Sequence, residues 1–132
     1  MTPLSEPDPP GAGFSDAETP VAALAAALAA FNRARDWEQF HTPKDLAMAL
    51  AVEASELLEL FLWKRDGELP PAERLREELG DVLITLTNLA ARLGVDLMAA
   101  AEAKLALNAR RYPVERARGS AKKYDALAEE EP

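Results

Sequence analysis

The chain contains no cysteine and only one histidine. Without cysteine it forms neither disulfides nor thiolate-bound zinc sites, so disulfide content says nothing about the compartment. The single histidine also excludes a di-iron carboxylate bundle, which needs a Glu-x-x-His motif on each of two helices. No apolar run reaches the roughly 18 residues that a membrane-spanning helix requires. A disulfide scaffold, a zinc finger, a di-iron protein and a membrane span are therefore not expected.

Positive charge is also scarce, because 15 Lys and Arg face 23 Asp and Glu, for a formal net charge of −8. This balance argues against binding to polymeric nucleic acid, which usually requires a basic surface. It is compatible with a small anionic substrate, because a bound metal and local basic groups can invert the field. The N-terminus carries Glu6 and Asp8 among prolines, unlike a basic and then apolar signal peptide. We expect a soluble, cytoplasmic protein with no membrane partner.

The length of 132 residues predicts one domain. Residues 1–16 are rich in proline, glycine, serine and acidic residues, which predicts a disordered tail. Residues 17–127 form the predicted domain, and residues 128–132 form a short acidic tail.

Four helices are predicted inside this domain. Thr42 and Pro43 are typical of a helix start, Gly94 of a helix end, and Asp96 of a further N-cap. The segment after Pro113 is charged and poorly patterned, and no strand signal stands out. The predicted class is all-α, a four-helix bundle with short connections. The four helices are expected at about residues 18–35, 43–64, 72–93 and 97–111.

Acidic residues interrupt the apolar stripes of the second and third helices. Glu53 lies at a position of the apolar stripe of the second helix, and Glu56 lies one turn further on. Glu78 and Asp81 lie beside the stripe of the third helix. The two stripes are Leu46, Leu50, Glu53, Leu57 and Leu60, and Leu75, Leu79, Val82, Leu86, Leu89 and Leu93.

Burying ionised carboxylates costs several kcal/mol each unless a positive charge compensates them. No Lys or Arg stands three or four residues from Glu53. Oxygen ligands without cysteine or histidine suit Mg²⁺ or Mn²⁺. The alternative is a set of salt bridges between helices, for example to Lys104.

The fourth helix becomes polar along its inward face, which runs through Leu97, Ala101, Lys104, Asn108 and Arg111. Its last three members would suit a polyphosphate–metal complex if they face the carboxylates. The alternative is an ordinary solvated helix end.

Aromatic rings gather around the second helix. Trp37, Phe40 and His41 precede it, and Trp63 lies at its predicted end. Such rings can stack against a flat base. The alternative is packing in the core.

Taken together, these residues resemble the dCTP pyrophosphatase branch of the MazG-like all-α NTP pyrophosphatases. The resemblance covers roughly residues 24–127. The two acidic pairs indicate the superfamily, whereas the aromatic connector and the basic tail motif indicate the branch. The motifs are Asp36-Trp37-Glu38-Gln39-Phe40-His41-x-Pro43, Glu53-x-x-Glu56, Phe61-x-Trp63-Lys64, Glu77-Glu78-Leu79-x-Asp81-Val82-Leu83, Val95-Asp96-Leu97, Lys104, Asn108-x-Arg110-Arg111-Tyr112-Pro113 and Arg118-Gly119-Ser120-x-x-Lys123-Tyr124.

The resemblance implies hydrolysis of dCTP, or of a modified cytosine nucleotide, to the monophosphate and pyrophosphate in nucleotide-pool house-cleaning. Glu53 or Glu56 would act as the base. It also implies a homo-oligomer, with a tetramer favoured over a dimer. The implied ligands of Mg²⁺, or of Mn²⁺ as a substitute, are Glu53, Glu56, Glu78 and Asp81; the base would contact Trp37, His41 and Trp63, and the phosphates Lys104, Asn108, Arg111, Lys123 and Tyr124.

Three positions depart from the pattern of this branch. Ser55 replaces a glycine, Thr85 replaces a tyrosine and Leu28 replaces a histidine. The last two changes remove polar rings from the implied base pocket. Two alternatives stay open: the same chemistry with a broad or different base preference, such as dUTP or damaged nucleotides, and a non-catalytic helical oligomer with structural carboxylates.

Overall fold

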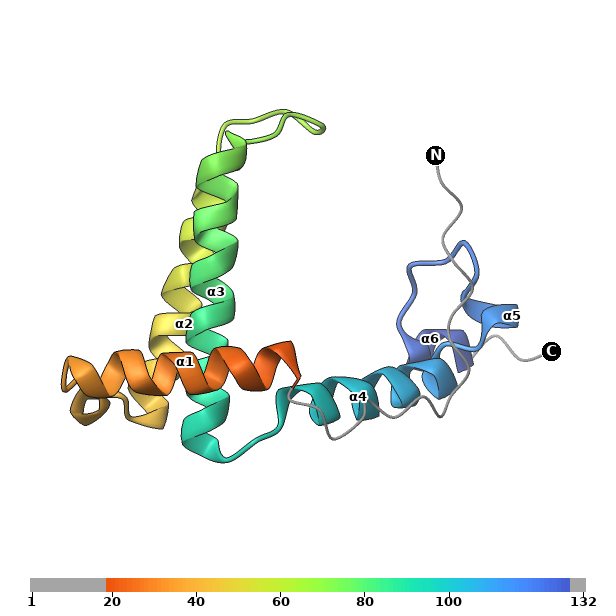
Figure 1. The fold of residues 1–132 in the computed structure, drawn as a ribbon. Helices are drawn as coiled ribbons and strands as arrows, with labels where there is room; N and C mark the ends of the chain where they lie inside the picture. The colour runs from red at the N-terminus through yellow and green to blue at the C-terminus, as the bar shows by residue number, and fades with distance from the viewer. Residues whose placement is uncertain (1–18, 129–132) are drawn as a thin grey trace.

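The computed structural model describes residues 19–128, and all regular structure in this range is helical (Figure 1). The all-α prediction is confirmed for these residues. The predicted N-terminal tail, residues 1–16, lies outside the described residues, as do residues 129–132 of the predicted acidic tail. The elements are α1 (Pro20–Ala34), the 3₁₀ turn η1 (Glu38–Phe40), α2 (Pro43–Glu59), α3 (Ala72–Leu93), α4 (Leu97–Arg111), α5 (Val114–Ala117) and α6 (Tyr124–Ala128).

Local capping chemistry sets most helix ends where the sequence predicts them. The Thr42 hydroxyl accepts a hydrogen bond from the Asp45 N–H at 3.1 Å and opens α2. The Asp96 carboxylate accepts one from the Ala99 N–H at 3.0 Å and opens α4. Gly94 ends α3 in the left-handed conformation, with φ of 66°.

The end of α2 was predicted wrongly. The helix stops at Glu59 rather than near Lys64, because the following N–H groups bond three residues back instead of four. The Leu62 N–H reaches the Glu59 carbonyl at 3.2 Å, and the chain then passes through Trp63 with φ of 64°. A bulky residue at positive φ is unfavourable, so this turn is strained.

Two short helices were not predicted. α5 has four residues and α6 has five. Such lengths span little more than one turn, too short for an apolar period to stand out in the sequence.

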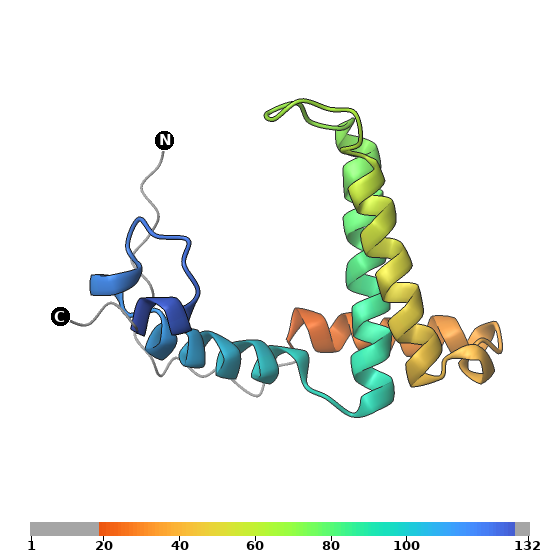
Figure 2. The same cartoon turned by 180° about the vertical axis from the view of Figure 1, so that it is seen from behind.

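The helices α2 and α3 form a hairpin, and α1 lies across it (Figures 1 and 2). Beyond its first residues, α4 leaves the hairpin and carries α5 and α6 away from it. The axes of α3 and α4 are bent by 98° across the link that contains Gly94. The four-helix bundle predicted from the sequence is therefore not formed within one chain, because this link directs α4 outward.

Few apolar side chains are buried in this open arrangement. On α3 the buried residues include Glu78, Thr85 and Thr87, whereas Leu79 and Leu93 of the predicted stripe are 50% and 55% exposed. The predicted stripe is thus partly wrong, because α3 is rotated so that its neighbouring polar positions face the other helices. Among the described residues no single helix is long and apolar enough to span a membrane, although α3 and α4 taken together would be, despite their bend.

Candidate metal centre and nucleotide site

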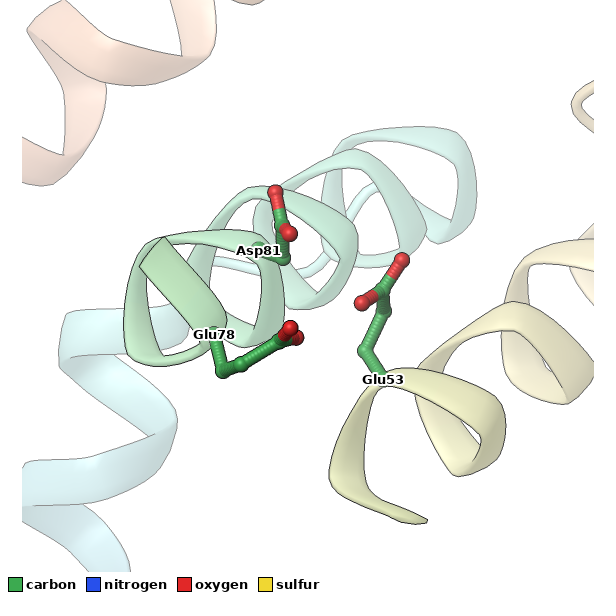
Figure 3. A group of neighbouring side chains, drawn as sticks. All are labelled: Glu53, Glu78 and Asp81. Carbon is green, nitrogen blue, oxygen red and sulfur yellow. The ribbon is translucent and has the colours of Figure 1, made fainter. Parts of the chain in front are cut away.

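The hairpin brings three carboxylates from two helices to one place. Glu53 projects from α2, and Glu78 and Asp81 project from α3, toward the same space between the helices (Figure 3). One carboxylate oxygen of each residue lies within 4.8 Å of those of the other two. Glu78 is buried, Glu53 is half-buried and Asp81 is exposed, so the cluster is open on one side.

The mutual repulsion of these groups appears in their pKa values. Burial raises the pKa of Glu53, and the neighbouring carboxyl groups of Glu56, Asp81 and Glu78 raise it further. Burial likewise raises the pKa of Glu78, with Glu56 and Asp81 adding to the effect and Arg74 opposing it. Because Glu56 acts on both residues, it lies beside the cluster.

Two buried oxygens of the cluster have no hydrogen-bond partner among the described residues. They are Oε2 of Glu53 and Oε2 of Glu78. Arg74 approaches the other oxygen of Glu78 at 3.9 Å, from a side chain that is 59% exposed. Such a solvated pair contributes little. Lys104, the predicted salt-bridge partner, makes no ion pair with the cluster, because α4 leads away from it.

This donor set fits a divalent cation. Carboxylate oxygens are the ligands that Mg²⁺, Mn²⁺ and Ca²⁺ prefer. Buried polar atoms without partners are rare in proteins and call for an explanation such as a bound ion. An ion between the two helices would satisfy both orphan oxygens and neutralise the repulsion.

The three predicted base-binding residues are not brought together in one chain. Trp37 and His41 lie in the connector before α2, where the Trp37 ring meets Phe31 edge-on at 5.6 Å between centroids. Trp63 follows the opposite end of α2, which at 17 residues is about 25 Å long. Its side chain is 100% exposed, so core packing within this chain is excluded for Trp63.

The predicted phosphate-binding residues lie on α4 and at the start of α6. Arg111 and Tyr124 are brought together, with the guanidinium 4.3 Å from the centre of the ring. Tyr112 meets the same ring edge-on at 6.2 Å. This region lies away from the hairpin (Figures 1 and 2). Lys104, Asn108, Arg111, Lys123 and Tyr124 are therefore not assembled with the carboxylates of their own chain.

One polar pair was missed by the sequence reasoning. Asn32 of α1 is buried and donates a hydrogen bond from Nδ2 to Oδ1 of Asn88 on α3 at 3.1 Å. A signal was present, because Asp81, Thr85 and Asn88 follow a spacing of four and three residues on α3. That spacing places them on one helix face.

Comparison with known proteins defines the class to which the chain belongs. The MazG-like family profile matches residues 48–127, and the chain belongs to the MazG-like family. The matched range contains all four predicted metal ligands but neither Trp37 nor His41.

Particular relatives support the same branch. The chain is 53% identical to dCTP pyrophosphatase 1 of Homo sapiens in an alignment of 106 positions that covers 75% of this chain and 62% of the human protein. Identity to dCTP pyrophosphatase 1 of Mus musculus is 54%, with the same coverage. The chain thus spans less than two thirds of the length of these curated relatives. The predicted resemblance to the dCTP pyrophosphatase branch is confirmed.

A solved structure shares the fold. A pyrophosphatase from Archaeoglobus fulgidus matches with a TM-score of 0.61 and 32% identity, over 69% of this chain and 90% of the archaeal one.

Proposed function

We propose that this chain hydrolyses dCTP, or a modified cytosine deoxynucleotide, between the α- and β-phosphates. The products are the monophosphate and pyrophosphate, as expected of an enzyme that cleans the cytoplasmic nucleotide pool. The observation that carries the proposal is the cluster of Glu53, Glu78 and Asp81 with two buried oxygens left unpaired. The names of its relatives support this choice of reaction.

The proposed cofactor is Mg²⁺, with Mn²⁺ as a substitute, held by Glu53, Glu56, Glu78 and Asp81. When bound, Mg²⁺ neutralises phosphate oxygens and lowers the pKa of a water molecule. The proposed base is Glu53 or Glu56, because a carboxylate can hold the metal with one oxygen while the other oxygen accepts a proton from water. This base takes a proton of the attacking water, while the water oxygen bonds to the α-phosphorus and pyrophosphate leaves.

We also propose that the active unit is a homo-oligomer, in which another copy supplies the α4–α6 residues to each carboxylate cluster. Support comes from the separation of these groups within one chain. Further support comes from large apolar side chains that are exposed on several helices, such as Leu58, Leu83 and Leu105. Apolar surface spread over α2, α3 and α4 offers more than one contact, which favours a tetramer over a dimer.

A second candidate for the base preference follows from Leu28 and Thr85, the two positions at which polar rings of the branch are missing. Neither residue offers a free hydrogen-bond donor. Leu28 and Thr85 are both buried, and the Thr85 hydroxyl donates to the backbone carbonyl of Asp81 at 2.8 Å. A pocket that lacks the polar rings of the branch at these positions favours a broader range of bases, including dUTP or damaged nucleotides.

The deciding experiment measures pyrophosphate release from common dNTPs, NTPs and 5-substituted dCTPs, with Mg²⁺ and with EDTA. Metal-dependent release that is fastest on a cytosine nucleotide is the expected result. Release spread over several bases would favour the second candidate. No release from any nucleotide, while the metal still binds, would overturn the enzyme and favour a non-catalytic helical oligomer.

A further inference from the structure

A polar stripe runs along α3 from the carboxylate cluster to a second site. Asp81, Thr85, Asn88 and Arg92 succeed one another at spacings of four, three and four residues. They therefore share one face of the helix. Seven residues separate Asp81 from Asn88, which is about 10 Å along a helix. This separation matches the scale of one nucleotide between its phosphates and its base.

At the far end of the stripe lies a cavity of about 200 Å³ between α1, η1 and α3. Its polar lining comes from Asn32, Glu38, His41, Asn88 and Arg92. The cavity therefore lies beside His41, one of the predicted base contacts. The cavity is rich in hydrogen-bonding groups, whereas neither Leu28 nor Thr85 offers a free hydrogen-bond donor.

The side-chain amides of Asn32 and Asn88 in this cavity are held in place, but they keep unused hydrogen-bonding groups. The Asn32 backbone carbonyl accepts a hydrogen bond from the Trp37 N–H at 3.0 Å, which ties α1 to the aromatic connector. The side chain of Asn32 donates a hydrogen bond from Nδ2 to Oδ1 of Asn88. Oδ1 of Asn32 and Nδ2 of Asn88 then have no hydrogen-bond partner among the described residues. One acceptor and one donor therefore remain on the amide pair that lines the cavity.

The edge of cytosine requires one acceptor and one donor, because its 4-amino group donates and its N3 accepts. Amide oxygens and amide N–H groups of asparagine are among the groups that read base edges. We infer that Asn32 and Asn88 read the hydrogen-bonding edge of the nucleobase in this chain, in place of the polar rings missing at positions 28 and 85. This inference rests on the proposed function of the carboxylate cluster.

The test uses binding rather than turnover, so that it does not depend on catalysis. Calorimetric titration of the full chain compares dCMP with the monophosphate of 2-pyrimidinone deoxyriboside, which lacks only the 4-amino group. The wild-type protein should bind dCMP about 10- to 100-fold more tightly, because the analogue leaves the Asn32 acceptor without a partner. Equal binding of both ligands by the wild-type protein would overturn the inference.

The decisive variant changes both asparagines, Asn32→Leu with Asn88→Leu. Replacing both partners of a hydrogen bond by apolar groups of similar shape is nearly neutral for stability. The dCMP preference should fall to about one in this variant. Thr87→Val is the matched control, because Thr87 is buried on the same helix but lines a different cavity.

An unchanged preference in the double variant would show that the pair only joins α1 to α3, and the inference would be wrong. Failure of the proposed function would give a different result. The wild-type protein would release no pyrophosphate, although it would still prefer dCMP in the binding test. The double variant would still lose that preference.

Discussion

The α2–α3 hairpin and the arm formed by α4 to α6, residues 97–128, treat their charged groups in opposite ways. The hairpin draws acidic residues into partly buried positions, where they repel one another and two oxygens lack partners. The arm carries Arg111 and Tyr124, which meet each other and lie away from the acidic residues of the hairpin. In the proposed enzyme, each region would supply one half of the site for a metal-bound polyphosphate. Complementary charges of one sequence therefore need not meet within a single chain.

The largest effect is expected from a substitution in the carboxylate cluster of the hairpin. Glu53→Gln should lower pyrophosphate release by about 100- to 10,000-fold, the usual contribution of a general base. The metal-free protein should be at least as stable, because a buried repulsive charge is removed. Steady-state rates and urea unfolding measure the two effects. Glu73→Gln, an exposed acid on α3, is the control. A loss of several kcal/mol in metal-free buffer would instead support structural salt bridges.

The second largest effect is expected from a substitution in the arm. Arg111→Ala should lower the rate about 100- to 1,000-fold, as loss of one transition-state donor does. If arms act on the hairpins of other copies, an inactive Arg111→Ala chain mixed with an inactive Asp81→Asn chain should regain part of the activity. In the mixed oligomer, some sites would combine the hairpin of an Arg111→Ala chain with the arm of an Asp81→Asn chain. Such a site contains neither substitution. Activity assays after subunit exchange measure this, and no recovery would show that each arm serves its own hairpin.

A smaller effect concerns Trp63, the fully exposed ring at the far end of α2. Trp63→Ala should raise KM for the preferred nucleotide by about 10- to 100-fold if the ring stacks on a base. It should change kcat less, and it should barely alter the stability of the isolated chain. Kinetics across several bases check this, and an equal loss on all of them would indicate a packing role.

The smallest effect is electrostatic and belongs to the metal-free hairpin. Because the folded protein raises the pKa of Glu53 and Glu78, it holds their protons more tightly than the unfolded chain. Its stability should therefore be highest below the ordinary glutamate pKa and should decrease as pH rises through the raised values. Urea midpoints across this range measure the slope. Saturating Mg²⁺ should reverse the loss at neutral pH, and Glu53→Gln should flatten the slope.

Part of the candidate site could be predicted because its signals are local. Glu53 and Glu56 are one turn apart on one helix, as are Glu78 and Asp81 on the next, so spacing alone places each pair on one face. A hairpin then needs only to bring two such faces together. Asn32 and Asn88 were missed because their hydrogen bond joins residues 56 positions apart. No period within either helix reveals which partner the other will supply.

The sequence by itself determined where α1, α2, α3 and α4 begin, where α3 ends, which carboxylates share a helix face, and membership in the MazG-like family. These features depend on caps such as Thr42 and Gly94 and on helical spacing, which act within a few residues. Tertiary structure alone decided the rotation of α3 that exposes Leu79, the meeting of Asn32 with Asn88, and the departure of α4 from the hairpin. These features depend on how whole helices pack and on the direction of one short link, and local sequence preferences do not encode either.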